Sequence, residues 1–131
     1  MINFFSKYRG IFYFTNLFLV ILYIFPGSLL GCVFIDDCDT QPQITPGISI
    51  MSLNHVYAFA FISIVGFLTF KKNEIDYLII YLLSLSIILE FTHLIIPIRN
   101  FQWEDILGNL LGVIIVTIFY KIIGKYGKLK K

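Results

Sequence analysis

Residues 77–96 read YLIIYLLSLSIILEFTHLII, an apolar stretch whose only carboxylate and imidazole belong to Glu90 and His93. A helix of about 20 residues rises about 30 Å, which is the thickness of the hydrocarbon core of a bilayer. Three further apolar runs flank this one, and the four predicted spans cover residues 11–31, 48–70, 77–96 and 106–124. The pattern predicts an all-α membrane protein, a bundle of four transmembrane helices in a single domain over residues 1–131.

The composition excludes the other common classes of protein. The chain is 58% hydrophobic and 14% charged, whereas soluble domains carry about 25% charged residues and disordered chains are poor in apolar residues. Two cysteines are too few for a secreted disulfide scaffold. Five lysines gather at the C-terminus, where they suit an anionic membrane surface better than nucleic acid; they are Lys121, Lys125, Lys128, Lys130 and Lys131.

The connections between the predicted spans alternate in charge. Nine of the ten Lys and Arg residues fall in the two termini and the loop after the second span, and Arg99 alone falls on the opposite side. The positive-inside rule therefore predicts that both termini are cytoplasmic and that the protein is a multi-pass protein of the inner, cytoplasmic membrane. Trp103 on the outer side and Tyr77 on the inner side fit interfacial aromatic belts.

The end of the first predicted span is irregular. Pro26-Gly27 predicts that the helix kinks or ends there, with residues 28–35 returning to the surface. The run Leu29-Leu30-Gly31-Cys32 resembles a lipoprotein cleavage site, but the chain stays apolar after Cys32, which argues against cleavage. Cys32 and Cys38 both fall on the predicted outer side, where a disulfide and two separate thiols are the open alternatives.

Inserting an ionisable group into the membrane costs about 2.5 to 3.5 kcal/mol, so such groups inside a span indicate a structural or functional role. Helix rise puts His55, Glu90 and Asn109 at one depth, about 9 to 10 Å inside the outer boundary. We expect one polar pocket that opens outward. Arg99 would either reach Glu90 or Asp105, or bind an anionic ligand through its guanidinium group. The candidate ligand-binding residues are His55, Glu90, His93, Arg99, Asp105 and Asn109.

Each polar residue also has a structural interpretation. Gly108 and Gly112 form a G-x-x-x-G pair for helix packing, within the chain or in a homodimer, and Asn109 can serve as a hydrogen-bonding link between helices. Glu90 and His93 match one Glu-x-x-His motif, but di-metal bundles need two such motifs, so we expect no metal and no cofactor.

One further pattern spans half of the chain. The spacing Glu90-x2-His93-x3-Pro97-x-Arg99-x-Phe101-x3-Asp105-x3-Asn109-x2-Gly112, preceded by His55-x2-Ala58-Phe59, resembles the VanZ-like membrane proteins. Met51, Ser52, His93 and Gln102 depart from that family's usual residues. The resemblance implies a link to resistance against the glycopeptide antibiotic teicoplanin, and it implies no mechanism.

The residues favour a pocket that binds an anionic membrane lipid or a cell-envelope precursor, with a glycopeptide as a further candidate ligand. On this interpretation Arg99→Ala should weaken lipid binding at little cost in stability. One alternative is an intramembrane acid-base enzyme with Glu90 or His55 as general base. The other is a set of polar groups that only positions the helices, without catalysis.

Overall fold

The computed structural model describes residues 8–45 and 50–129, with side chains through residue 125. It is helical, and its elements are α1 (Arg9–Ile24), α2 (Leu29–Phe34), α3 (Leu53–Thr69), the 3₁₀ helix η2 (Lys72–Glu74), α4 (Ile75–Thr92) and α5 (Trp103–Leu129). Residues 48–49 of the second predicted span lie outside the described part, as do Lys130, Lys131 and the side chain of Lys128.

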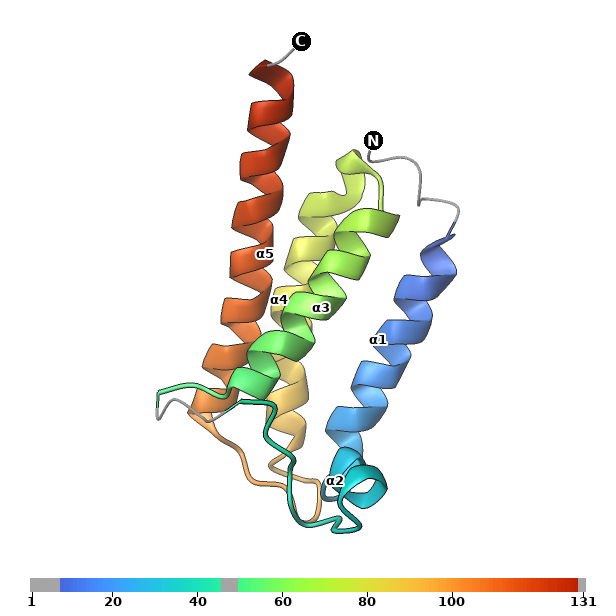
Figure 1. The fold of residues 1–131 in the computed structure, drawn as a ribbon, viewed down its shortest axis with the longest axis vertical. Helices are drawn as coiled ribbons and strands as arrows, with labels where there is room; N and C mark the ends of the chain where they lie inside the picture. Colours follow the sequence, from blue (N-terminus) through green and yellow to red (C-terminus); the bar gives the residue numbers. More distant parts are fainter. Residues whose placement is uncertain (1–7, 46–49, 130–131) are drawn as a thin grey trace.

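The long helices α1, α3, α4 and α5 run alternately up and down and lie side by side (Figure 1). α3 contacts each of the other three, most extensively α5. α1 begins and α5 ends at the same end of the bundle, where η2 also lies. The loops before α3 and before α5 meet at the other end, and that end carries the polar site described below.

α1 is shorter than the first predicted span. It ends at Ile24, and the next residues turn so that α2 folds back beside its end, as Pro26-Gly27 predicts. Gly27 has a φ of 81°, and a Cβ atom there would lie 2.5 Å from the carbonyl oxygen of Cys38. Both the conformation and the close approach therefore require glycine. The 16 residues of α1 rise about 24 Å.

The G-x-x-x-G pair brings α5 against α3. A Cβ atom at Gly112 would lie 2.5 Å from the carbonyl oxygen of Val56, and one at Gly108 would lie 2.5 Å from that of Ser52. The backbone of Ser52 also donates a hydrogen bond of 3.2 Å to the carbonyl of Glu104. This glycine face is thus used within the chain, so the predicted homodimer would need another surface.

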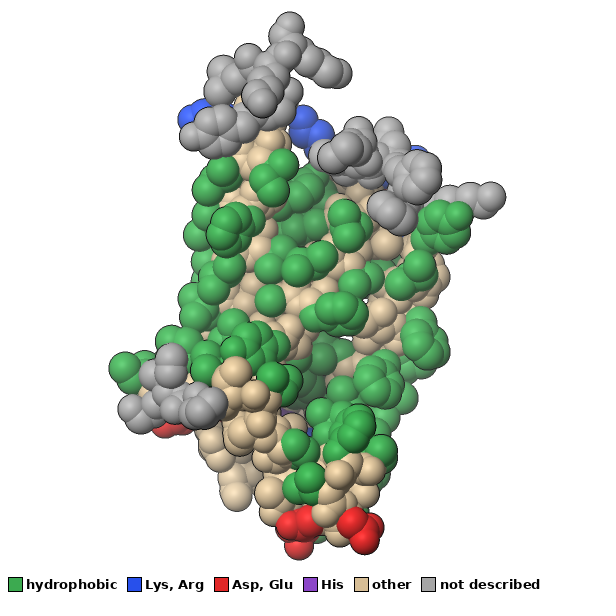
Figure 2. All heavy atoms as spheres, viewed as in Figure 1, with side chains coloured by type: hydrophobic (Ala, Val, Ile, Leu, Met, Phe, Trp, Pro, Cys, Tyr) green, Lys and Arg blue, Asp and Glu red, His purple; other side chains and the backbone are tan. Residues whose placement is uncertain are grey.

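The outer surface of the bundle is apolar. The side chains of Phe59, Ile62, Leu82 and Val113 are fully buried, yet large apolar side chains also face outward on every long helix, among them Phe14, Phe61, Ile88 and Phe119. Figure 2 shows apolar side chains over most of the visible face, with Lys and Arg at one end and Asp and Glu at the other. Helices that are apolar on all sides are typical of membrane spans.

Two helical segments are long and apolar enough to cross a membrane, Lys72–Thr92 and Trp103–Lys125. α1 and α3 are apolar but have 16 and 17 residues. By length and composition the structure therefore points to a membrane protein, with α4 and α5 as its candidate spanning helices.

Candidate functional site

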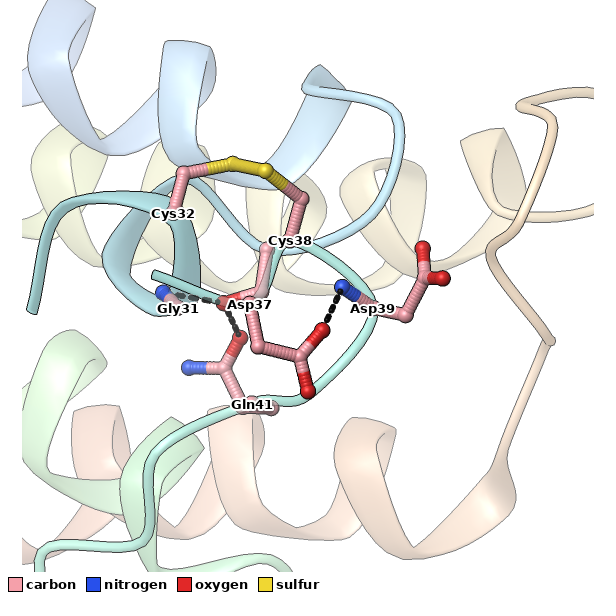
Figure 3. Close-up of a disulfide and its surroundings, with 7 residues drawn as sticks. Gly31, Cys32, Asp37, Cys38, Asp39 and Gln41 are labelled. Atoms are coloured by element: carbon pink, nitrogen blue, oxygen red, sulfur yellow. Dashed lines mark hydrogen bonds between the residues drawn. A yellow bond between two sulfur atoms is a disulfide. The ribbon is translucent and has the colours of Figure 1, made fainter. Parts of the chain in front are cut away.

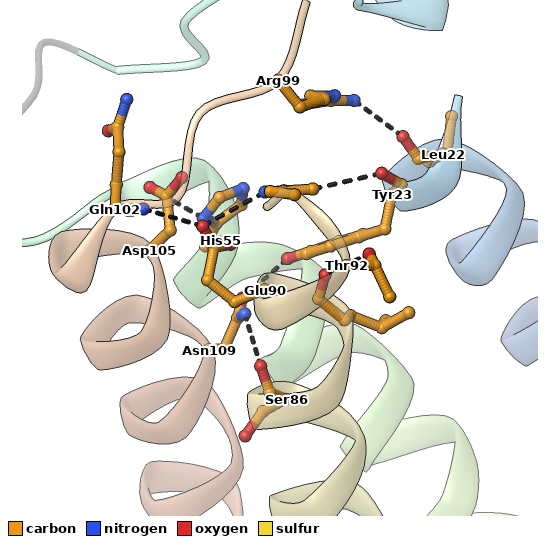
Figure 4. A network of polar contacts seen from close by, with 12 residues as sticks. Leu22, Tyr23, His55, Ser86, Glu90, Thr92, Arg99, Gln102, Asp105 and Asn109 are labelled. Atoms are coloured by element: carbon orange, nitrogen blue, oxygen red, sulfur yellow. Dashed lines mark hydrogen bonds and ion pairs between the residues drawn. The ribbon is translucent and has the colours of Figure 1, made fainter. Parts of the chain in front are cut away.

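A chain of buried hydrogen bonds joins three helices near the end at which α1 terminates (Figure 4). The hydroxyl of Tyr23 on α1 donates to Oδ1 of Asn109 on α5 at 2.6 Å, and Nδ2 of Asn109 donates to the carbonyl oxygen of Ser86 on α4 at 3.1 Å. Asn109 and Ser86 are fully buried. Because both ends of the amide are engaged inside the bundle, Asn109 links helices.

Glu90, on the last turn of α4, and His93, which directly follows the helix, form a second buried pair. Oε1 of Glu90 accepts a hydrogen bond of 2.9 Å from the backbone N–H of Gln102 and lies 3.1 Å from Nδ1 of His93. Nε2 of His93 lies 3.1 Å from the carbonyl oxygen of Tyr23. A carbonyl only accepts, so this nitrogen is the donor. The pair thereby ties the loop before α5 to the end of α1.

The second carboxylate oxygen of Glu90 is not hydrogen-bonded. The residue is fully buried, and its Oε2 has no hydrogen-bond partner. A buried carboxylate oxygen without a partner is unusual and needs an explanation.

His55 on α3 faces Asp105 on α5. Nδ1 of His55 lies 2.9 Å from Oδ1 of Asp105, but the contact is not aligned as a hydrogen bond. Both side chains are mostly buried, with 16% and 14% of their surfaces exposed. One potential ligand atom from each of His55, Glu90 and Asp105 lies within 4.8 Å of the others, and no other group of this kind occurs among the described residues.

Arg99 contacts backbone and forms no ion pair with Glu90 or Asp105 in the described part of the chain. Nη2 donates to the carbonyl oxygen of Leu22 at 2.9 Å and Nε donates to that of Phe25 at 3.3 Å. These carbonyls belong to the C-terminal end of α1, where a cation is favoured. Burial lowers the pKa of Arg99, while Tyr23, Glu90 and Asp105 act in the opposite direction.

A polar cavity of about 490 Å³ opens at this end of the bundle. Its lining includes His55, His93, Arg99 and Asp105, together with loop residues such as Ser28 and Gln41. Glu90 and Asn109 are not among the lining residues. The sequence-predicted site therefore divides into residues that face a pocket and residues buried beneath it.

An apolar cavity of about 460 Å³ adjoins the polar one. It is lined mainly by side chains of α1, α2 and α3, among them Leu19, Leu22, Ala58 and Phe61. The two cavities share four lining residues, namely Gln41, Asn54, His55 and Arg99. A polar space and an apolar space thus meet at His55 and Arg99.

A disulfide-linked segment forms one wall of the polar cavity. Cys32 is joined to Cys38 (Figure 3), and the N–H of Ser28 donates to the carbonyl oxygen of Cys38 at 2.6 Å. The hydroxyl of Ser28 donates to Oε1 of Gln41 at 2.8 Å and accepts from the N–H of Gly31 at 2.9 Å. These bonds hold Gln41 at the wall, where Asp39 also lies.

Sequence reasoning missed two participants, Tyr23 and Gln41. Tyr23 stands in an apolar span, where tyrosine is common. The sequence feature that could have identified it is its position three residues before Pro26, close to the predicted end of the helix. A buried tyrosine hydroxyl needs a partner. Gln41 lies in a loop whose path depends on the disulfide, so its position has no sequence signal.

Comparisons of the chain with protein-family models, with curated proteins and with solved structures found no match.

Proposed function

We propose that this is a multi-pass protein of the cell membrane, with four spans, both termini cytoplasmic and the polar cavity facing outward. Arg9, Lys71, Lys72, Lys121 and Lys125 all belong to the end at which α1 begins, as the positive-inside rule expects of a cytoplasmic side. The disulfide belongs to the opposite end, and disulfides persist in oxidising compartments. Trp103, which is 66% exposed, suits a membrane interface there.

Within that membrane protein, the cavities bind a lipid or an envelope precursor with an anionic headgroup. The observation that carries this proposal is the junction of the polar and apolar cavities at shared residues. A membrane amphiphile has the same division, a polar head joined to an apolar chain. Sites for small molecules are concave and mostly apolar, with a few polar groups that fix the orientation.

The charges of the cavity set the orientation of such a headgroup. Arg99 is the cation among the described lining residues, and Asp39, Glu104 and Asp105 are the acids. Two of the five N–H groups of Arg99 hold carbonyls of α1, and the remaining donors can bind a phosphate. The anionic group therefore belongs beside Arg99, and hydroxyl or amine groups of the ligand belong beside the acids.

The VanZ-like family remains the proposed relationship, and it rests on the motif alone. The motif residues His55, Glu90, Asp105 and Asn109 gather in one part of the bundle, which supports treating them as one site. A role in resistance to teicoplanin is part of this proposal. A cell-envelope precursor is the class of ligand that would connect this role with the cavities.

The experiment that tests the proposal introduces a larger side chain into the apolar cavity. Ala58 lines it on α3, so Ala58→Phe should exclude an acyl or prenyl chain. Ile64→Phe is the matched control, because Ile64 lies on the same helix, is 46% exposed and lies outside the cavity lining. Both proteins are purified in mild detergent, and the lipids that remain bound are identified by native mass spectrometry.

We expect the wild-type protein and Ile64→Phe to retain an anionic lipid that Ala58→Phe has lost. Equal lipid content in all three proteins would contradict the proposal and would leave the polar network with a structural role only. A retained lipid without an anionic group would contradict the assigned headgroup class.

A further inference from the structure

We propose that His55, Glu90 and Asp105 bind a divalent transition-metal ion such as Zn²⁺ or Mn²⁺. The three side chains come from α3, α4 and α5, so no local spacing in the sequence connects them. The structure brings one ligand atom of each within 4.8 Å of the others. The sequence motif considered for a metal, Glu90 with His93, is a different pair, since His93 turns its Nε2 to the carbonyl of Tyr23.

Two unsatisfied atoms support a missing ligand at this position. Oε2 of Glu90 and Nδ1 of His55 are both buried and without a hydrogen-bond partner. Burial of a polar atom without a hydrogen bond is costly. Oε2 of Glu90 has no partner, and Nδ1 of His55 has only the misaligned contact with Oδ1 of Asp105. A metal ion bound between the three side chains would satisfy both atoms at once.

The charge balance points the same way. Glu90 and Asp105 bring two carboxylates close together, and Arg99 directs its hydrogen bonds to carbonyls of α1. Like charges this close disfavour each other, and a cation between them removes the repulsion. A shared proton would also do so, and that arrangement is the competing outcome of the test below.

The donor set fits a first-row transition ion. Imidazole nitrogen favours Zn²⁺ and related ions, and carboxylate oxygen suits Mn²⁺ as well, whereas Ca²⁺ and Mg²⁺ prefer oxygen alone. Ligands about 2.1 Å from an ion lie about 3.4 Å apart in tetrahedral geometry, so ligand atoms up to 4.8 Å apart must approach by up to about 1.4 Å. Nδ1 of His55 and Oδ1 of Asp105 are 2.9 Å apart, so these two atoms would separate by about 0.5 Å on binding the ion.

The surroundings orient the ligands as metal sites require. Oε1 of Glu90 accepts a hydrogen bond from the N–H of Gln102, and Nδ1 of His93 lies 3.1 Å from the same oxygen. A supporting hydrogen bond of this kind commonly fixes a metal ligand. Three protein ligands leave at least one coordination position open, and His55 and Asp105 line the polar cavity. The ion would also lower the negative charge of that cavity, which favours an anionic headgroup if the proposed function holds.

The test uses the full chain, purified without a histidine tag, treated with a chelator and then titrated with Zn²⁺, Mn²⁺ and Mg²⁺. Bound metal is measured by mass spectrometry of the elements, which requires no lipid and no activity. We expect about one Zn²⁺ or Mn²⁺ per chain and no retention of Mg²⁺. His55→Gln and Asp105→Asn should each weaken binding by more than about a hundredfold, beyond the usual effect of residues that only orient a ligand.

Asp36→Asn is the matched control, because it removes the charge of an exposed aspartate outside the cavity lining. Co²⁺ provides a second readout: the single tryptophan, Trp103, lies two residues before Asp105, so bound Co²⁺ should quench its fluorescence saturably. Circular dichroism checks that each variant remains helical. Wild-type protein that retains no metal and shows no saturable quenching would overturn the proposal and indicate the shared proton. Equal binding in wild type, His55→Gln and Asp105→Asn would also overturn it.

Discussion

Arg99 donates a hydrogen bond of 2.9 Å to the carbonyl oxygen of Leu22, so the loop before α5 holds the C-terminal end of α1. A second bond, from Nε to the carbonyl of Phe25, completes the contact. At the opposite end of α1, Arg9 forms an ion pair with Glu74, which also accepts from the N–H of Lys71. One arginine thus fastens each end of this helix.

Arg99→Ala should destabilise the protein by about 2 kcal/mol, because it leaves two carbonyls of α1 without a charged donor. The midpoint of unfolding in detergent measures the effect. Arg99→Lys should recover less than half of the loss, since an ammonium cannot reproduce the planar fork. Unchanged stability of Arg99→Ala would contradict the capping role and would restore Arg99→Ala as a simple probe of ligand binding.

Tyr23→Phe should cost about 1 kcal/mol, because Oδ1 of Asn109 loses its buried donor. Asn109→Ala should cost more, since it leaves the hydroxyl of Tyr23 without its acceptor and also removes the hydrogen bond to the carbonyl of Ser86. A double-mutant cycle isolates the pair, and we expect a coupling energy of about 0.6 to 1.5 kcal/mol. Additive effects would show that the two side chains act separately.

Gly112→Ala should destabilise the bundle by about 1 to 3 kcal/mol, because its Cβ would overlap the backbone of Val56 and Ala60 on α3. Gly124→Ala is the control on the same helix, since nothing lies within 4 Å of a Cβ atom there. That change should be neutral or stabilising by up to about 1 kcal/mol. Equal effects of the two substitutions on the unfolding midpoint would argue against close packing of α3 and α5.

Cys38→Ser should loosen the wall of the polar cavity, with a loss of about 2 kcal/mol for a loop this short. In wild-type cells a membrane-impermeant maleimide should label Cys32 and Cys38 only after treatment with an impermeant reductant. That result would support both the disulfide and the outward orientation. Labelling without reductant would contradict the disulfide, and labelling that requires permeable reagents would reverse the proposed topology.

The sequence predicts that polar residues of several helices lie together, but it does not predict the contacts made by the loops. Helix rise puts His55, Glu90 and Asn109 at one level, and the structure places ligand atoms of His55 and Glu90 within 4.8 Å of each other. The depth of that level in a membrane stays a prediction. The partners of Arg99 could not be predicted, since its acceptors are backbone carbonyls that become free only where α1 ends. The trio of His55, Glu90 and Asp105 likewise depends on how three helices are rotated, and the sequence does not determine that rotation by itself.

The brevity of α1 has a mechanical consequence in a bilayer. A helix that rises about 24 Å is about 6 Å shorter than the hydrocarbon thickness, whereas α5, with 27 residues, exceeds it. In the four-span topology that we propose, the bilayer would become thinner beside α1, at a cost of a fraction of a kcal/mol for each ångström. The apolar cavity lies on this side, between α1 and α3. If the proposed function holds, a lipid strained by that mismatch would need less energy to leave the leaflet and enter the apolar cavity.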